Sequence, residues 1–341
     1  MFARRHQYNL NRYLLTLAIC VLTSACASQY QCKQPLTHHW VDLEQVKADV
    51  TKLSHDDMQG RKTNTSGAEF ARSYIAKRFA QIGLTPWAAL ERDDYQQPFE
   101  YQYQFSDRTG INMVAVHLAK PSSEQASKQL SKQSSDRWRV VVAHYDHLGK
   151  RGSKVYNGAD DNASGVSGLF AIAEHWANLP IAQDVNLMLV ATDAEEIGLY
   201  GGYGIVEELT KQQVKPELML NLDMIGQPPR SKSIYIEGDK NLEQFAALKW
   251  QLYQHNNLCV REQRSHKPAL GLGRTNWLKA SDHYPFHKAK VPWVYLGVPP
   301  HRHYHQLTDT AETINYEFLA ATIETGLEIL QVDQNQILPI D

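Results

Sequence analysis

The stretch RVVVAHYDH, residues 139–147, joins a compact apolar run to a cluster of polar side chains. A run as apolar as RVVVA suits a strand that is buried on both faces of a sheet. Similar runs follow at VNLMLVAT (185–192), LMLNL (218–222) and VPWVYLGV (291–298), and helical stretches such as ASGVSGLFAIAEHWANL (163–179) lie between them. Strands that alternate with helices predict an α/β fold with a mixed, largely parallel central sheet flanked by helices.

Length and charge narrow the kind of protein. The chain has 341 residues, of which 43% are hydrophobic, which is enough for a substantial core. Its formal net charge is −2 and no basic motif is visible, so we expect no nucleic-acid partner. No internal repeat and no clear linker interrupt the pattern. We therefore expect a single domain over residues 35–341.

The first residues have the pattern of an export signal. Three arginines precede an apolar run, residues 14–22, which is followed by the small residues TSACAS. This order of a basic region, a short apolar region and a small-residue cleavage site is typical of a signal peptide. The run is too short to span a bilayer comfortably. We expect residues 1–26 to be a signal peptide and the protein to be exported from the cytoplasm.

Two processing outcomes fit this segment. LTSAC resembles a bacterial lipobox, which would make Cys26 a lipidation site and anchor the protein to a membrane in the periplasm or cell envelope. Thr23 stands where a lipobox usually has Leu. The other outcome uses Ala25-Cys26-Ala27 as the cleavage site and releases a soluble periplasmic or secreted protein.

The cysteines agree with export. Cys20 lies in the signal segment, and Cys26 is either lipidated or removed. Cys32 and Cys259 remain, and in an oxidising compartment we expect them to form a disulfide. Two unrelated buried thiols are the alternative.

Acidic and imidazole side chains follow each apolar run. Open α/β sheets bind ligands at the carboxyl ends of their strands, so we expect these side chains to lie together. Carboxylates cannot cluster unless protons or cations neutralise them. Histidine and carboxylate ligands without thiolate suit zinc, and suit manganese or cobalt less well. The groups are His144-Tyr145-Asp146-His147, Asp160-Asp161, Asp193-Ala194-Glu195-Glu196, Asp223 and His301-Arg302-His303-Tyr304-His305.

The sequence NGADDNASG (157–165) places two aspartates side by side between small residues. We interpret Asp160 as a metal ligand whose two oxygens bridge a pair of ions, roughly 3.5–4 Å apart as in two-metal hydrolases. Asp161 need not touch the metal. It could accept hydrogen bonds from the turn or orient the loop.

Six ordered blocks resemble the co-catalytic zinc aminopeptidases of peptidase family M28, and an entry segment at 53–84 resembles theirs. The resemblance covers nearly all of the chain after the signal segment and implies a zinc-exopeptidase fold. The blocks are HYDHLG (144–149), NGADDNASG (157–165), DAEEIGLYGG (193–202), NLDMIG (221–226), SDHYPF (281–286) and YHQLTDT (304–310).

The resemblance also implies a role for each residue. The metal ligands would be His144 and Asp223 on the first zinc ion, Glu196 and His305 on the second, and Asp160 between the two. In relatives the peptide bond that joins the two aspartates is cis, which Asp160-Asp161 would share. Asp146 would orient the imidazole of His144, and Glu195 would be the general base. Asp282 and His283 would line the site or brace its loop.

The function that we expect from this resemblance is removal of N-terminal residues from peptides that have a free α-amino group. Other peptidases of the family, a carboxypeptidase or a dipeptidase, are the first alternative. A glutaminyl cyclase, which shares the fold and uses one zinc ion, is the second, but cyclases lack the histidine found here as His144. A binding module that has lost its metals is the third, although every ligand position is filled here.

Overall fold

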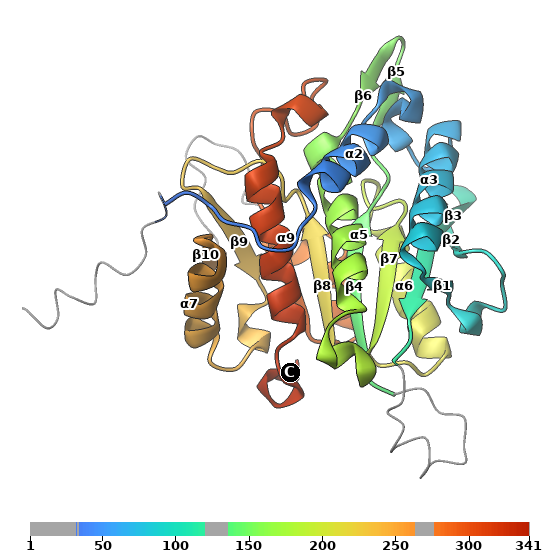
Figure 1. Cartoon of the computed structure of the whole chain (residues 1–341). Helices are drawn as coiled ribbons and strands as arrows, with labels where there is room; N and C mark the ends of the chain where they lie inside the picture. The colour runs from blue at the N-terminus through green and yellow to red at the C-terminus, as the bar shows by residue number, and fades with distance from the viewer. Residues whose placement is uncertain (1–31, 33, 120–135, 263–275, 341) are drawn as a thin grey trace, which may run out of the picture.

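The computed structural model describes residue 32 and residues 34–119, 136–262 and 276–340. Nine strands form one sheet in the order β1-β3-β7-β4-β8-β11-β9-β10, with β2 paired to β3 (Figure 1). Their bounds are β1 Thr85–Pro86, β2 Gln96–Tyr103, β3 Ser106–His117, β4 Trp138–His144, β7 Asn186–Thr192, β8 Leu218–Asp223, β9 Ser233–Glu237, β10 Cys259–Glu262 and β11 Trp293–Gly297. A separate pair, β5 (Gly149–Arg151) and β6 (Lys154–Tyr156), forms a short hairpin.

The centre of the sheet is parallel. Strands β7, β4, β8 and β11 lie next to one another and run in the same direction. Antiparallel pairing occurs toward the edges, where β3 joins β7 and β9 joins β11. The expected α/β fold with a mixed, largely parallel sheet is therefore confirmed.

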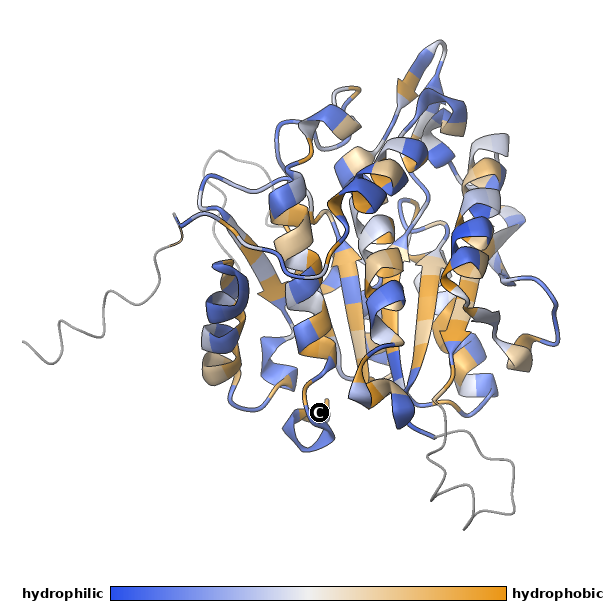
Figure 2. Cartoon of the chain, viewed as in Figure 1, coloured by the Kyte–Doolittle hydropathy of each residue, from blue (hydrophilic) through white to orange (hydrophobic). Residues whose placement is uncertain are grey.

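Helices cover both faces of the sheet. Strand β4 shows why: Val141 and Ala143 belong to the core cluster under one set of helices, and Val140 and Val142 to the cluster on the other face. Alternating directions of successive side chains bury every residue of the strand. Figure 2 shows the resulting apolar strands between amphipathic helices. One face carries α2 (Leu43–Leu53), α3 (Ser66–Ile82), α5 (Gly165–Trp176) and α9 (Tyr316–Leu330), and the other α6 (Tyr200–Lys211) and α8 (His283–Lys288).

The parallel strands end at a common edge. His144 at the end of β4 is paired in register with Thr192 at the end of β7, and Asp223 at the end of β8 with Gly297 at the end of β11. Residues that directly follow these strands are therefore brought to one edge of the sheet, although they are far apart in the sequence.

The N-terminal segment is attached to the edge of the sheet that β10 forms. Residues 34–42 cross α9 on their way to α2 (Figure 1). The Asn257 side chain donates a hydrogen bond to the backbone oxygen of Pro35, and a disulfide joins Cys32 to Cys259 in β10, the pair expected from the sequence. Asn257 follows α7 (Phe245–Asn256), which packs against β10 and α9.

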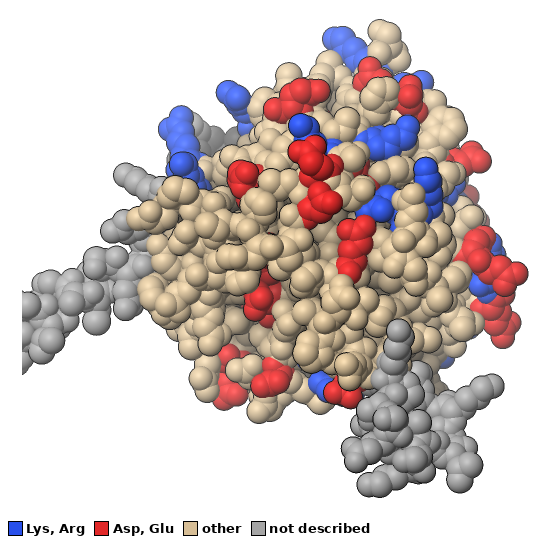
Figure 3. Space-filling model, viewed as in Figure 1, with Lys and Arg blue, Asp and Glu red and all other residues tan. Residues whose placement is uncertain are grey.

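The expected signal peptide, residues 1–26 with Cys26, lies outside the described residues. Among the helices of the described ranges, none has the length and apolar character needed to cross a membrane. On the face shown in Figure 3, lysine and arginine side chains lie among aspartate and glutamate side chains rather than in one basic surface.

The disulfide gives a first prediction. A cross-link between residues 227 positions apart removes conformational entropy from the unfolded chain, so its loss should lower the free energy of unfolding by about 2–5 kcal/mol. Peptide mapping of the unreduced protein should recover one linked peptide that contains both cysteines, and urea unfolding of Cys259→Ser should show the loss. Alkylation of both cysteines without reduction would contradict the pairing.

Candidate metal centre

The carboxylate of Asp161 lies between two histidines. Its Oδ1 atom is 3.4 Å from Nε2 of His144, and its Oδ2 atom is 3.1 Å from Nε2 of His305. His144 ends β4, Asp161 lies in the turn Ala159–Ser164 that leads into α5, and His305 lies in the loop after β11. One carboxylate thus connects segments that the sheet brings together.

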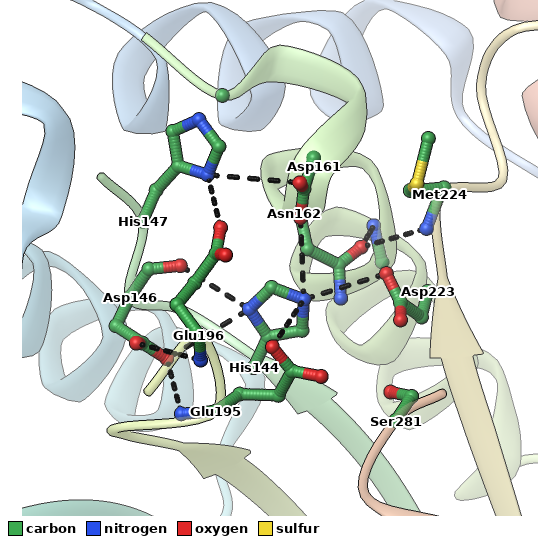
Figure 4. Close-up of polar contacts among 12 residues, drawn as sticks. His144, Asp146, His147, Asp161, Asn162, Glu195, Glu196, Asp223, Met224 and Ser281 are labelled. Atoms are coloured by element: carbon green, nitrogen blue, oxygen red, sulfur yellow. Dashed lines mark hydrogen bonds and ion pairs between the residues drawn. The ribbon is translucent and has the colours of Figure 1, made fainter. Parts of the chain in front are cut away.

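Two groups of side chains that could bind a metal ion lie around this carboxylate (Figure 4). They are called the first and the second donor group below. In the first, Nε2 of His144 is 3.4 Å from Oδ1 of Asp223 and 4.0 Å from Oε2 of Glu195. In the second, Oε2 of Glu196 is 3.1 Å from Nε2 of His305. The structure therefore brings together five predicted residues: His144, Asp223, Glu195, Glu196 and His305.

The spacing of these donors fits metal ions. Zinc binds nitrogen and oxygen ligands at 2.0–2.2 Å, so two ligands of a tetrahedral ion are about 3.3 Å apart. The four ligand pairs here are separated by 3.1–3.4 Å. Nε2 of His305 is buried and forms no hydrogen bond within the described residues, although two carboxylate oxygens lie 3.1 Å away. A buried polar atom without a hydrogen bond is costly, and a shared ion would satisfy it.

The structure corrects the expected role of Asp160. Its Oδ1 atom accepts a hydrogen bond from the backbone N–H of Gly226 at 2.6 Å, and its Oδ2 atom lies 2.8 Å from Nε2 of His301. Asp160 therefore ties three loops together and belongs to neither donor group. The cis peptide bond is Asp161–Asn162, not Asp160–Asp161 as expected. Adjacent side chains point in different directions, and the pair Asp-Asp does not reveal which one faces the histidines.

Asp309 stabilises the turn that contains Asp160 and Asp161. Its buried carboxylate accepts hydrogen bonds from the backbone N–H groups of Asp160 and Asp161 at 3.0–3.2 Å. Burial, together with the nearby charge of Asp160, raises the pKa of Asp309 to about 6. With the contact between His301 and Asp160, this bond fixes the loop that carries His305 against the turn that carries Asp161.

Asp146 lies beside the imidazole of His144, as expected from the sequence, and also binds the backbone. Its carboxylate is 3.7 Å from Nδ1 of His144, too far for a hydrogen bond, and that nitrogen lies 3.2 Å from the backbone oxygen of Asp146 instead. The carboxylate oxygens accept the backbone N–H groups of Glu195 at 3.1 Å and Glu196 at 3.4 Å. Asp146 thus positions the turn that presents both glutamates.

His147 supports the second donor group. Its Nδ1 atom is 2.6 Å from Oε1 of Glu196, and the histidine side chain is fully buried. Burial opposes ionisation of Glu196, but His147 and His305 together outweigh it and hold the pKa of this carboxyl below its usual range. The sequence contains His147 in HYDH, but nothing in the pattern assigns it to Glu196.

The neighbouring Glu195 has the opposite electrostatic environment. Burial is the main cause that raises its pKa well above the ordinary value, opposed by the charge of His144 and reinforced by that of Asp223. Two adjacent glutamates therefore differ in proton affinity because two histidines outweigh the effect of burial at Glu196, whereas His144 does not outweigh it at Glu195.

A buried arginine, Arg61, fixes the loops that carry the donors. Its guanidinium donates hydrogen bonds of 2.6–2.8 Å to the backbone oxygens of Tyr145, Leu53, Asn157 and Gly158. Burial lowers its pKa to about 10, against the raising effect of the nearby aspartates, so the group stays charged at neutral pH. The segment before α3 shows no sequence signal of this role.

Asp282 and His283 are buried and contact neighbouring groups of the protein beside the site. The Asp282 carboxylate accepts the hydroxyl of Thr192 at the end of β7, and burial raises its pKa to about 6. His283 lies 2.9 Å from the backbone oxygen of Trp277, and burial lowers its pKa to about 4. Neither residue belongs to a donor group.

A cavity opens beside the donors. Its lining combines four carboxylates and His144 with apolar and aromatic side chains. Among the described residues that line it, none is lysine or arginine. The lining consists of His144, Asp161, Glu195, Glu196, Asp223, Met224, Trp277, Ala280, Tyr295, Val298, Pro300 and Tyr304.

A family model described as peptidase family M28 matches residues 127–330 of the chain. Aminopeptidase YwaD of Bacillus subtilis is 28% identical over 155 residues, which are 44% of this chain and 30% of that protein. The alkaline phosphatase isozyme conversion protein of Escherichia coli is 26% identical over 183 residues, 48% of this chain and 46% of that protein. The chain thus spans less than half the length of these curated relatives.

Solved structures of similar fold cover most of the chain. A Zn-dependent exopeptidase from Parabacteroides distasonis has a TM-score of 0.63 at 15% identity, covering 87% of this chain and 100% of that one. The glutaminyl cyclase of Porphyromonas gingivalis has a TM-score of 0.62 at 16% identity, covering 85% of this chain and 98% of that one. At such identities the similarity establishes the fold alone.

Metal binding to this site should release protons. Burial alone would lower the pKa of His305, but the Asp161 and Glu196 carboxylates outweigh it and raise it to about 10 in the metal-free protein. Below that pH an ion must displace the proton, so the apparent affinity should rise with pH by up to about tenfold per unit for each proton displaced. Calorimetric zinc titrations at pH 7.5, in buffers of different ionisation enthalpy, should show net proton release. Binding without proton release would contradict this pKa.

Proposed function

The chain belongs to peptidase family M28, and we propose that within this family of peptide hydrolases it is a two-zinc aminopeptidase. It would remove single residues from peptides that carry a free N-terminus. The observation that carries the proposal is the position of Asp161, whose two oxygens face histidines of two separate donor groups.

The donor set fits two zinc ions. Asp161 would bind both, with His144 and Asp223 completing one set and Glu196 and His305 the other. Bound zinc would supply Lewis acidity to the scissile carbonyl and lower the pKa of a water molecule. His147, Asp309 and Arg61 would hold the ligands in place.

Glu195 is the proton carrier in this proposal. Its carboxylate lies 4.0 Å from His144, at the rim of the first donor group, and lines the cavity. A base at this position can take a proton from water and pass it to the leaving amine. Its raised pKa favours holding the proton between these two events. The backbone bond from Glu195 to Asp146 would fix its position.

The cavity lining favours an N-terminal over a C-terminal substrate end. Four carboxylates line it, and the described lining residues include no cation that could pair with a C-terminal carboxylate. Two bound zinc ions would offset these four carboxylates, so it is the lack of lysine and arginine in the described lining, rather than the acidic charge, that favours a substrate with a free N-terminus. The apolar part of the lining with Met224, Trp277 and Val298 would receive the side chain of the N-terminal residue.

We also propose that the protein is exported, with residues 1–26 as signal peptide and Cys26 as a lipidation site. The arrangement of basic, apolar and small residues supports export, and so does a disulfide between Cys32 and Cys259.

Peptides with free and acetylated N-termini test the activity. The zinc-loaded protein should shorten only the free peptides, one residue at a time, as followed by mass spectrometry. Glu195→Gln should lower the rate by about 10²–10⁴-fold, because the amide cannot carry a proton, and should keep its zinc. C-terminal trimming or cleavage of dipeptides alone would refute the aminopeptidase, and loss of ammonia from N-terminal glutamine would identify a glutaminyl cyclase.

A matched pair of variants tests the bridging residue. Asp161→Asn should lose its catalytic zinc and its activity together, because a neutral amide cannot serve as a bridging carboxylate. Asp160→Asn can still accept from Gly226, so it should keep its zinc while unfolding becomes easier by about 1–3 kcal/mol, the usual cost of a disrupted buried polar contact. Zinc content measured by mass spectrometry and urea unfolding check both. The reverse pattern would assign the bridge to Asp160.

A further inference from the structure

A third group of metal-type donors lies outside the catalytic centre. His39, His255 and Glu324 each offer a donor atom, and these atoms lie within 4.8 Å of one another. His39 precedes α2 in the N-terminal segment, His255 lies in the last turn of α7, and Glu324 lies in the middle of α9. None of these elements contributes a ligand to the catalytic centre.

Glu324 is fixed by the N-terminal segment. Its side chain is 0% exposed, and its Oε1 atom accepts hydrogen bonds from the backbone N–H groups of His39, Trp40 and Val41, at 2.5, 2.9 and 3.4 Å. These bonds use one carboxylate oxygen and determine the direction of the other. They account for the shape of the segment but leave Oε2 without a hydrogen bond.

The second oxygen pairs with a histidine at ion-pair distance but forms no hydrogen bond with it. Oε2 of Glu324 lies 3.2 Å from Nε2 of His255, and both atoms are buried without a hydrogen bond within the described residues. Leaving both atoms unsatisfied would be costly. A separation of 3.2 Å matches the distance of about 3.3 Å between two ligands of a tetrahedral zinc ion.

The catalytic centre provides an internal comparison. Nε2 of His305 has the same combination of burial, no hydrogen bond and carboxylate oxygens 3.1 Å away. The contact between His255 and Glu324 thus has the geometry of a histidine-carboxylate pair in the centre itself.

His39 completes the group. Its ring centroid is 4.6 Å from that of His255, and its Nε2 atom lies 2.7 Å from the backbone oxygen of His255. Metal-bound histidines usually donate their other ring N–H to a carbonyl or carboxylate, and this contact is of that kind. His39 is exposed to solvent, so water can supply the fourth ligand.

We propose that His39, His255 and Glu324 bind a zinc ion that is separate from the catalytic ions. The ion clamps the N-terminal segment to α7 and α9, since the three ligands join positions 216 and 285 residues apart. It reinforces the same attachment as the disulfide between Cys32 and Cys259. Its role is structural, because no ligand of this site lines the substrate cavity.

Zinc content measured by mass spectrometry tests the site in the purified protein after gel filtration. His255→Gln should contain one zinc equivalent less than wild type and keep its peptidase activity. His175→Gln is the control, because His175 packs on Trp40 near Glu324 but is not a donor of the group. It should keep the full zinc content. Equal zinc content in wild type and His255→Gln would overturn the proposal.

A second measurement does not depend on the folding of His255→Gln. In Asp161→Asn, which lacks the catalytic bridge, one zinc equivalent should remain and zinc addition should raise the melting temperature. Absence of both effects would overturn the proposal. The readout of the first measurement is a difference of one equivalent between wild type and His255→Gln, so it is independent of whether the catalytic centre holds two ions, one or none.

Discussion

Buried carboxylates crowd one edge of the sheet, and their mutual repulsion constrains everything around them. Each of these carboxylates faces either backbone N–H groups or histidines. Asp309 and Asp146 accept backbone N–H groups, Asp160 faces His301, and Glu196 faces two histidines. Asp161 and Asp223 face His144, at the spacing of metal ligands. Removing any one partner would leave a charge in a medium that solvates it poorly.

Arg61 reduces the same repulsion between carboxylates, although it forms hydrogen bonds to backbone oxygens only. Four of its five N–H groups donate hydrogen bonds to backbone oxygens, while its charge acts on the whole acidic group. Asp161, Asp309, Asp146 and Glu196 all raise its pKa, which shows that its charge acts on all four. A single cation thereby orders the loops after β4 and before α5 and offsets repulsion between the acids that those loops carry.

The features that could be predicted from the sequence are those that depend on hydrophobic periodicity and on the residues that follow each strand. Buried parallel strands appear as continuous apolar runs, so the sheet and the ligands that follow its strands could be found. The choice between Asp160 and Asp161 could not, because it depends on the directions of two adjacent side chains. Arg61, His147 and Asp309 were missed because their partners are backbone groups or distant residues. The contact between His255 and Glu324 links two helices whose sequences read as ordinary helix.

The acidic and the apolar residues of the cavity lining come from different segments of the chain. The acidic residues come mainly from the ends of the central strands, whereas Trp277 and Ala280 come from the turns before α8, and Val298 and Pro300 from the loop after β11. Substitutions in those turns can reshape the apolar part of the lining while the proposed metal ligands stay where the sheet puts them. Tyr304 is the exception, since its ring stacks on His305 at 3.8 Å. Proteins that descend from one ancestral gene could therefore come to prefer different substrate side chains while they keep the same candidate ligands, provided that Tyr304 is retained.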